Sequence, residues 1–153
     1  MKIIRILILI ILVSNFIRCD RKDNDKIKNL TVEKYIGLLK SNRYNSLNLP
    51  ELSIKDIPAL LEYRNESQVI TDFPQNPISS LYLPECKLGI YVLWTIESIR
   101  AVSVNGTSLV MRFPSQNPIL GKRISIEMNM VADDFSHKIA ANAYYRWWYS
   151  SGN

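Results

Sequence analysis

The most notable candidate for chemistry is a glutamate next to an apolar segment. Glu97 directly follows residues 88–96, in which nearly every side chain is apolar. Burial there would raise the pKa of its carboxyl and suit it to proton transfer. Arg100 stands three residues further on, however, at a spacing at which ion pairs form along a helix. We therefore predict that Glu97 is held in an ion pair and is not a catalytic acid.

The other candidates for catalysis or metal binding lack partners. His137 is the single histidine, and no cysteine pair stands at zinc-ligand spacing. The triplet GKR at 121–123 lacks the upstream glycine and the Ser or Thr of a phosphate-binding loop. Asp133 and Asp134 could form an acid/base pair or a calcium corner, but such carboxylates more often favour the positive end of a following helix. The sequence predicts no enzyme, no cofactor and no metal.

The stretch AYYRWWY (143–149) offers a different chemistry, because rigid aromatic rings can stack on sugar rings. On a helix, Tyr145, Trp148 and Tyr149 are expected to lie away from the face of Tyr144 and Trp147. These three residues form a candidate glycan-binding site. The competing interpretation is that all five aromatic side chains pack in the core. Burial of Trp148 would remove the main support for the glycan site.

The N-terminus has the pattern of an export signal. Lys2 and Arg5 form a basic start, and residues 3–17 are almost entirely aliphatic, which is too short for a membrane span of about 20 residues. Cys19 follows, as in a bacterial lipoprotein, although Arg18 stands where that pattern has a small residue. We predict that residues 1–19 are a signal or lipoprotein-type segment with lipid on Cys19. Another exported or signal-anchored form is the alternative, and a buried cytosolic helix is the third.

The charge distribution argues against nucleic-acid binding. Three of the 19 basic residues precede Cys19, which leaves 16 basic against 14 acidic residues and a net charge of +2. The remaining basic residues form no block with aromatic neighbours. Residues 20–30 mix both signs and are predicted to be a charged, solvated tether. Residues 31–153 are expected to form a single globular domain.

Three helices are expected in the first part of this domain. Thr31 is a candidate N-cap for a helix within residues 31–42, with an apolar stripe of Val32, Tyr35, Ile36 and Leu39. Ser53 and Asp56 resemble a capping box, and Pro58 lies near the first turn of a second helix with the stripe Ile54, Ile57, Leu60 and Leu61. Residues 86–102 are predicted to form a central helix enclosed by others, because residues 88–96 are apolar nearly all round and the polar residues lie mostly in the last turn. Gly89 would admit a close neighbour.

The periodicity changes after this central helix. Asn105-Gly106 lies between two β-prone runs in residues 101–113, which predicts a hairpin. Residues 124–130 alternate between apolar and polar, which favours a strand over the helical stripe also present there. Helical order returns at 136–150, with Ser136 as the cap and one apolar side formed by Ile139, Ala140, Ala143, Tyr144 and Trp147. The predicted fold is mainly α, a compact helical domain with a central buried helix and a minor β-hairpin or strand element.

Two similar stretches, FPQNPISS (73–80) and FPSQNPIL (113–120), are interpreted as helix starts. Asn76 and Asn117 can cap a helix whose first residue is proline, and the preceding Phe73 and Phe113 offer apolar plugs. A repeated ligand site is the alternative. Helix-pair repeats are disfavoured, because the segments that follow the two stretches differ.

Cysteine usage is sparse. Cys86 opens an apolar segment and is expected to be a small buried side chain and not a reactive thiol. A disulfide between Cys19 and Cys86 would require that Cys19 carries no lipid.

Several motifs together resemble a known family. They are LSIKDIPALLEY, FPQNPISS, LGIYVLWTIESIR, FPSQNPIL and AYYRWW, and they cover roughly residues 50–149. The combination is similar to a family of small, uncharacterised envelope proteins, many of them candidate lipoproteins, from anaerobic Gram-negative bacteria. The resemblance implies an exported, lipid-tethered domain of unknown function and brings no catalytic residues with it.

The function expected from these observations is a non-enzymatic module of the cell envelope. It would be attached to a membrane through the N-terminal segment or lipid, and it would bind an envelope protein. The sequence does not distinguish the periplasmic from the outer-membrane face. The alternative is a glycan-binding accessory protein that uses Tyr145, Trp148 and Tyr149. No nucleic-acid partner is expected.

Overall fold

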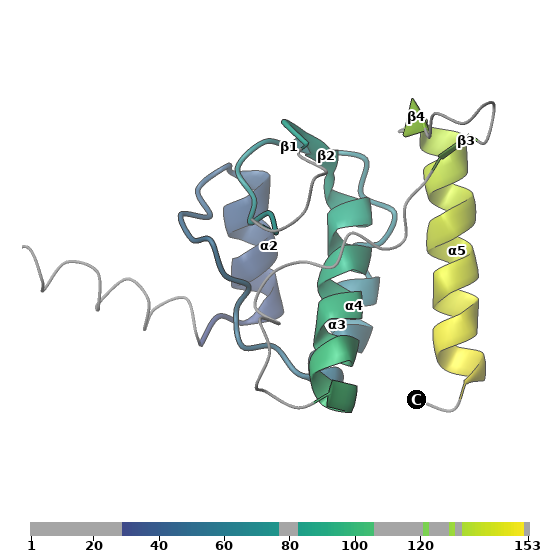
Figure 1. Cartoon of the computed structure of the whole chain (residues 1–153), viewed down its shortest axis with the longest axis horizontal. Helices are drawn as coiled ribbons and strands as arrows, with labels where there is room; N and C mark the ends of the chain where they lie inside the picture. Colours follow the sequence, from purple (N-terminus) through teal and green to yellow (C-terminus); the bar gives the residue numbers. More distant parts are fainter. Residues whose placement is uncertain (1–28, 77–82, 106–120, 123–128, 131–132, 152–153) are drawn as a thin grey trace, which may run out of the picture.

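The structure is a computed structural model of the whole chain, and it describes residues 29–76, 83–105, 121–122, 129–130 and 133–151 (Figure 1). The described helical elements are α2 (Val32–Lys40), the 3-10 turn η1 (Ile54–Asp56), α3 (Ile57–Leu61), α4 (Leu88–Asn105) and α5 (Asp134–Ser150). Two short antiparallel sheets pair β1 (Val69–Ile70) with β2 (Cys86–Lys87) and β3 (Gly121–Lys122) with β4 (Asn129–Met130). The predicted mainly α fold with a minor β element is confirmed.

Helix α2 begins and packs as its sequence predicts. The Thr31 hydroxyl accepts a hydrogen bond from the Lys34 backbone N–H, so Thr31 is the N-cap. The buried side chains are those of the predicted stripe, Val32, Tyr35, Ile36 and Leu39. The Tyr35 hydroxyl lies 3.1 Å from the Thr95 hydroxyl of α4, which satisfies two buried polar groups where the helices meet.

The second predicted helix is split into η1 and α3. Ser53 and Asp56 form the capping box, in which the Ser53 backbone N–H donates to the Asp56 carboxylate at 2.7 Å. Pro58 lies in the first turn of α3, where a missing N–H costs nothing. Three of the four stripe residues are fully buried, whereas Ile54 lies outside the core at 39% exposure.

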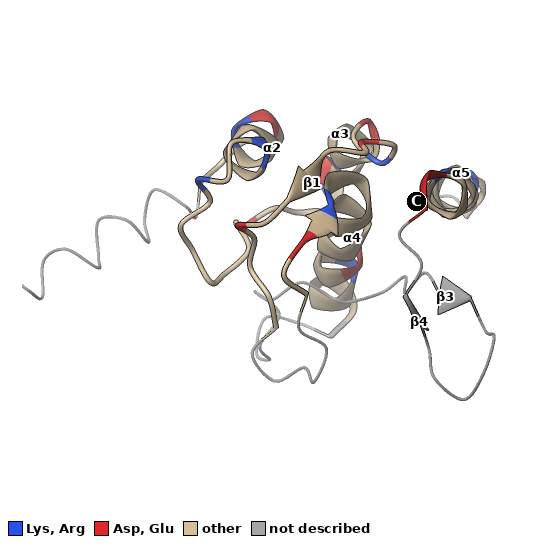
Figure 2. Ribbon diagram, turned by 90° about the horizontal axis from the view of Figure 1, so that it is seen from above, with Lys and Arg blue, Asp and Glu red and all other residues tan. Residues whose placement is uncertain are grey.

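Helix α4 is the central element. It lies between α2 and α5, with α3 beside it (Figures 1 and 2). Residues 88–96 are all buried, because neighbours cover this helix on every side. Within the part of the chain that the structure describes, no helix is both long and apolar enough to cross a bilayer.

The predicted hairpin around Asn105-Gly106 is wrong in its first half. Residues 101–105 continue α4 as a helix instead of forming a strand. Extending an existing helix adds one hydrogen bond for each residue fixed, and this local gain outweighs the weak β preference of the run. The second half of that hairpin lies outside the described residues.

The strand predicted at 124–130 is described only at its end. Asn129 and Met130 form β4, which pairs with Lys122 and Gly121, and residues 124–128 lie outside the described part. The pairing of β1 with β2 was not predicted, and it places Cys86 in a strand just before α4.

The first of the two similar stretches, which begins at Phe73, packs against the core through this phenylalanine, as predicted. Phe73 is buried, and its ring centroid lies 5.0 Å from that of Tyr91 in α4. The Tyr91 hydroxyl donates to the Pro74 carbonyl at 3.0 Å, which fixes the segment on the core. The helix expected after Asn76, and the whole second stretch with Asn117, lie outside the described residues, so capping stays a prediction there.

Candidate functional site

The last helix, α5, carries most of the residues singled out from the sequence, and Asp133 is its N-cap. The Asp133 carboxylate accepts hydrogen bonds from the backbone N–H and the hydroxyl of Ser136, both at 2.8 Å. The prediction that Ser136 caps this helix is therefore wrong: the stronger acceptor three residues upstream takes that role. Asp134 forms an ion pair with Lys87 at 2.6 Å. These two acidic side chains are thus engaged at the start of α5, one as its cap and one in an ion pair.

His137 fastens α5 to the rest of the domain. Its side chain is buried, and Nε2 lies 2.8 Å from the Arg64 backbone carbonyl. Gly89 of α4 makes room for this contact, because a Cβ there would lie 2.5 Å from His137 Nε2 and 2.4 Å from the Arg64 carbonyl oxygen. Burial lowers the pKa of His137, which favours the neutral ring. The close neighbour predicted for Gly89 is thus the only histidine of the chain.

Glu97 lies in a polar cluster between α4 and α5. The predicted ion pair is confirmed, since Arg100 donates to Glu97 Oε1 at 2.7 Å. The Tyr144 hydroxyl donates to the same oxygen, and the Arg100 guanidinium lies 4.2 Å from the centroid of the Trp147 ring. Burial, and then the bond to Glu97, raise the pKa of Tyr144 well above its usual range. The carboxylate is thus engaged by two donors that link the helices.

The aromatic residues of α5 are placed differently from expectation. Trp148 is only 3% exposed and belongs to the core, together with Ala141. Tyr145 is partly buried and packs against the core. The Arg64 guanidinium carbon lies 4.0 Å from the centroid of the Tyr145 ring, and the ring centroids of Tyr145 and Tyr149 are 4.7 Å apart. Of the three predicted glycan-binding residues, Tyr149 alone is an open aromatic face, at 50% exposure.

The apolar side predicted for this helix is wrong for Ile139, Ala143 and Trp147, which are exposed, whereas Tyr144 packs partly buried against the core. Ile139 and Trp147 are 54% and 37% exposed, because the face with His137, Ala141 and Trp148 packs inward instead. The sequence carries apolar residues on two faces of α5, so periodicity alone could not identify the buried one.

The exposed apolar face that results was not predicted as a site. We name it the outer ridge; it consists of Phe135, Ile139, Ala143 and Trp147, which recur every four residues and are all exposed. Residues at this spacing lie one above the other on a helix. The spacing is visible in the sequence, where it predicts a side that faces the core.

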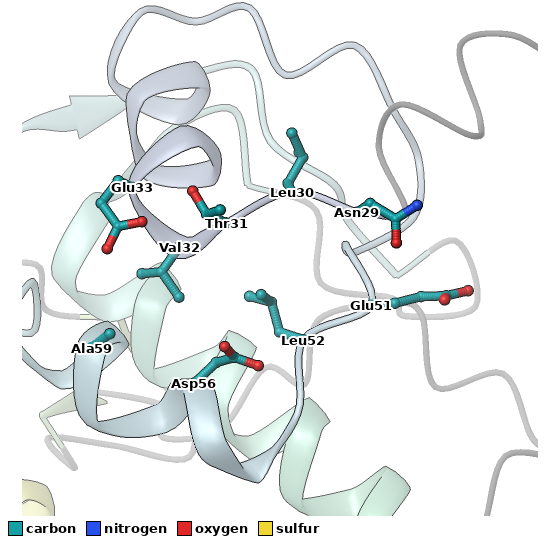
Figure 3. A pocket seen from close by; sticks show the side chains of 9 residues that line it. All are labelled: Asn29, Leu30, Thr31, Val32, Glu33, Glu51, Leu52, Asp56 and Ala59. Carbon is teal, nitrogen blue, oxygen red and sulfur yellow. The ribbon is translucent and has the colours of Figure 1, made fainter.

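A pocket of about 380 Å³ lies at the start of α2 (Figure 3). Leu30, Val32, Leu52 and Ala59 give it apolar walls, and its acidic side chains are Glu33, Glu51 and Asp56. Asp56 belongs to the capping box, and Glu33 lies in the first turn of α2, where a carboxylate favours the positive helix end. These two acidic groups therefore have roles in the fold.

Nucleophiles and metal ligands do not gather in the described residues. Burial raises the pKa of the free Cys86 thiol to about 12, so the thiol stays protonated at neutral pH. Among these residues no group of three or more His, Cys, Asp or Glu side chains could hold a metal ion.

Comparison with known proteins identifies one family. The model of a domain of unknown function, DUF4943, matches residues 26–153. No curated protein and no solved structure matches the chain. The match covers the predicted globular domain and the end of the tether, and the chain belongs to the DUF4943 family.

Proposed function

We propose that this chain is a non-enzymatic, lipid-tethered interaction module of the cell envelope. The observation that carries the proposal is the N-terminal sequence, which resembles an export signal: residues 3–17 are almost entirely aliphatic, and Cys19 follows after Arg18. Beyond Cys19 the charged residues 20–30 serve as a tether. The domain then presents the outer ridge of α5 as its contact surface, since large apolar patches on a soluble domain mark interaction sites.

The use of polar groups supports a structural rather than a catalytic role. Glu97 is engaged by Arg100 and Tyr144, and His137 is bonded to a backbone carbonyl. A general base needs a free lone pair within reach of a substrate proton, and a buried imidazole packed against Gly89 is shielded from substrates. The protonated Cys86 thiol is likewise a poor nucleophile.

Glycan binding is the second candidate. The exposed rings of Tyr149 and Trp147 support it, with Arg146 exposed beside them on the helix. The burial of Trp148 removes the central member of the aromatic set on which this candidate was based. Glycan binding therefore ranks below the interaction module.

Metabolic labelling with a tagged fatty acid tests the membrane attachment. The wild-type chain should be labelled, and Cys19→Ala should not, because it lacks the acceptor thiol. Cys86→Ala is the matched control and should be labelled like the wild type, since the partly buried Cys86 thiol has a raised pKa and is a poor nucleophile. Equal labelling of wild type and Cys19→Ala would contradict the proposal.

A further inference from the structure

We infer that the outer ridge of α5 docks on an anionic membrane surface. This inference rests on the proposed membrane attachment and names the partner of the contact surface. Docking would give the domain a second point of contact with the bilayer, besides the N-terminal tether.

The apolar groups of the ridge suit a bilayer interface. Phe135 and Ile139 are 75% and 54% exposed, and at the far end of the helix Trp147 is 37% exposed, with Tyr149 beside the ridge at 50%. A helix that lies in the interface buries Trp, Phe and aliphatic side chains at the boundary between headgroups and acyl chains. Tryptophan and tyrosine favour this boundary because each has an apolar body and a polar tip.

The charges of α5 point to an anionic partner. Lys138 and Arg146 are exposed basic residues of this helix. Its one acidic residue, Asp134, is already paired with Lys87. With Lys87 and the N-cap Asp133 included, three basic and two acidic side chains lie on or beside α5, and their net charge of +1 would favour contact with lipid phosphates.

The inner face of α5 prepares the helix for docking. Trp148 is packed in the core, His137 is bonded to Arg64, and Tyr144 is bonded to Glu97. Trp147 is held between the Arg100 guanidinium at 4.2 Å and the Tyr144 ring at 5.3 Å. The ridge is therefore already helical before contact, so docking need not include the entropic cost of folding a helix.

The tether is long enough for this contact. Asn29 lies at the start of α2 (Figure 3), and α4 lies between α2 and α5 (Figure 1). The segment 19–28 spans at most about 35 Å when extended. A domain of about 125 residues has a diameter of about 35 Å. A chain anchored at Cys19 can thus turn α5 toward the same membrane.

Tryptophan quenching in vesicles tests the inference on the full-length chain. The protein, purified from membranes, is reconstituted into vesicles of phosphatidylcholine and phosphatidylglycerol with bromine on the acyl chains. Flotation measures attachment, and quenching measures docking. Trp94 and Trp148 are buried, so Trp147 is the reporter. We expect strong quenching in the wild type and loss of most of it in Trp147→Phe.

Substitutions on the ridge separate docking from anchoring. Ile139→Asn should abolish quenching of Trp147, whereas Leu47→Asn, which changes an exposed leucine elsewhere, should leave it unchanged. Circular dichroism checks that both variants fold. Docking is measured over a range of salt concentrations and of fractions of anionic lipid. Under the same conditions, Lys138→Glu and Arg146→Glu should each weaken docking at least about fivefold relative to the wild type.

Each outcome bears on a distinct claim. A chain that floats without quenching of Trp147 overturns the docking and leaves the tether intact. Quenching that persists in Ile139→Asn, or that is equal on pure phosphatidylcholine, also overturns it, because the contact would then not use the ridge or its charge. A chain that does not float overturns the attachment, and with it the docking. A ridge buried against a protein or another segment of this chain would appear as missing quenching.

Discussion

Replacing Gly89 with alanine should weaken the attachment of α5 to the domain. The added Cβ would lie 2.4 Å from the Arg64 carbonyl oxygen and 2.5 Å from His137 Nε2, well inside normal contact distance. Overpacking of this kind costs about 1–3 kcal/mol. The better helix propensity of alanine returns at most about 1 kcal/mol, and less near a helix end. We expect Gly89→Ala to lower the free energy of unfolding by about 2 kcal/mol.

Gly37 in α2 is the matched control. A Cβ at Gly37 would meet nothing within 4 Å, and the position is helical. Gly37→Ala should therefore stabilise the domain by about 0.5–1 kcal/mol through helix propensity alone. The two glycine substitutions are chemically identical and are expected to have opposite signs.

Denaturant unfolding followed by tryptophan fluorescence measures both variants under the same conditions. A double-mutant cycle combines Gly89→Ala with His137→Ala, which removes the imidazole ring that the Cβ at residue 89 would meet. The cost of Gly89→Ala should then fall but not vanish, because the Arg64 carbonyl still lies in the way. If Gly89→Ala is as stable as Gly37→Ala, the close packing of α4 against His137 is refuted.

Three further predictions concern polar groups. Burial lowers the pKa of His137 in the folded state, so the unfolded chain binds more protons as the pH falls. The free energy of unfolding should decrease as the pH falls below about 6.5, and His137→Gln should flatten this dependence in pH-resolved melts. Glu97→Gln should lower the free energy of unfolding by about 1 kcal/mol, because the ion pair with Arg100 is partly exposed to water. Neither protein is expected to turn over glycosidic, ester or peptide substrates; wild-type turnover that vanishes in a folded Glu97→Gln variant would show an enzyme. Asn76→Ala and Asn117→Ala should each cost about 1 kcal/mol and the serine variants much less, and unmoved denaturation midpoints would argue against capping.

Local signals predicted the first half of the domain well. Thr31 caps α2, and Ser53 with Asp56 forms the capping box, because each bond joins residues three apart in the chain. The continuous apolar run of α4 likewise predicted a central helix, since a helix without a polar face must be enclosed. Features set by neighbouring residues could therefore be predicted from the sequence.

The features that the sequence did not predict depend on contacts between segments far apart in the chain. The partner of Gly89 is His137, 48 positions away, and nothing in local sequence identifies it. The orientation of α5 could not be predicted because Trp147 and Trp148 lie about 100° apart on the helix and either could face the core. For the same reason the sequence predicts burial of Ile139, Ala143 and Trp147, which the structure exposes. Two-residue strands such as β1 and β2 leave no periodic signal at all.

The mass of the mature chain tests the central claim, membrane attachment through Cys19, most directly. Intact-protein mass spectrometry of material extracted from membranes should show a chain that begins at Cys19 and carries additional mass from acyl groups. Base hydrolysis of ester-linked acyl chains should reduce that mass. A chain that begins at another residue and carries no lipid would contradict the attachment.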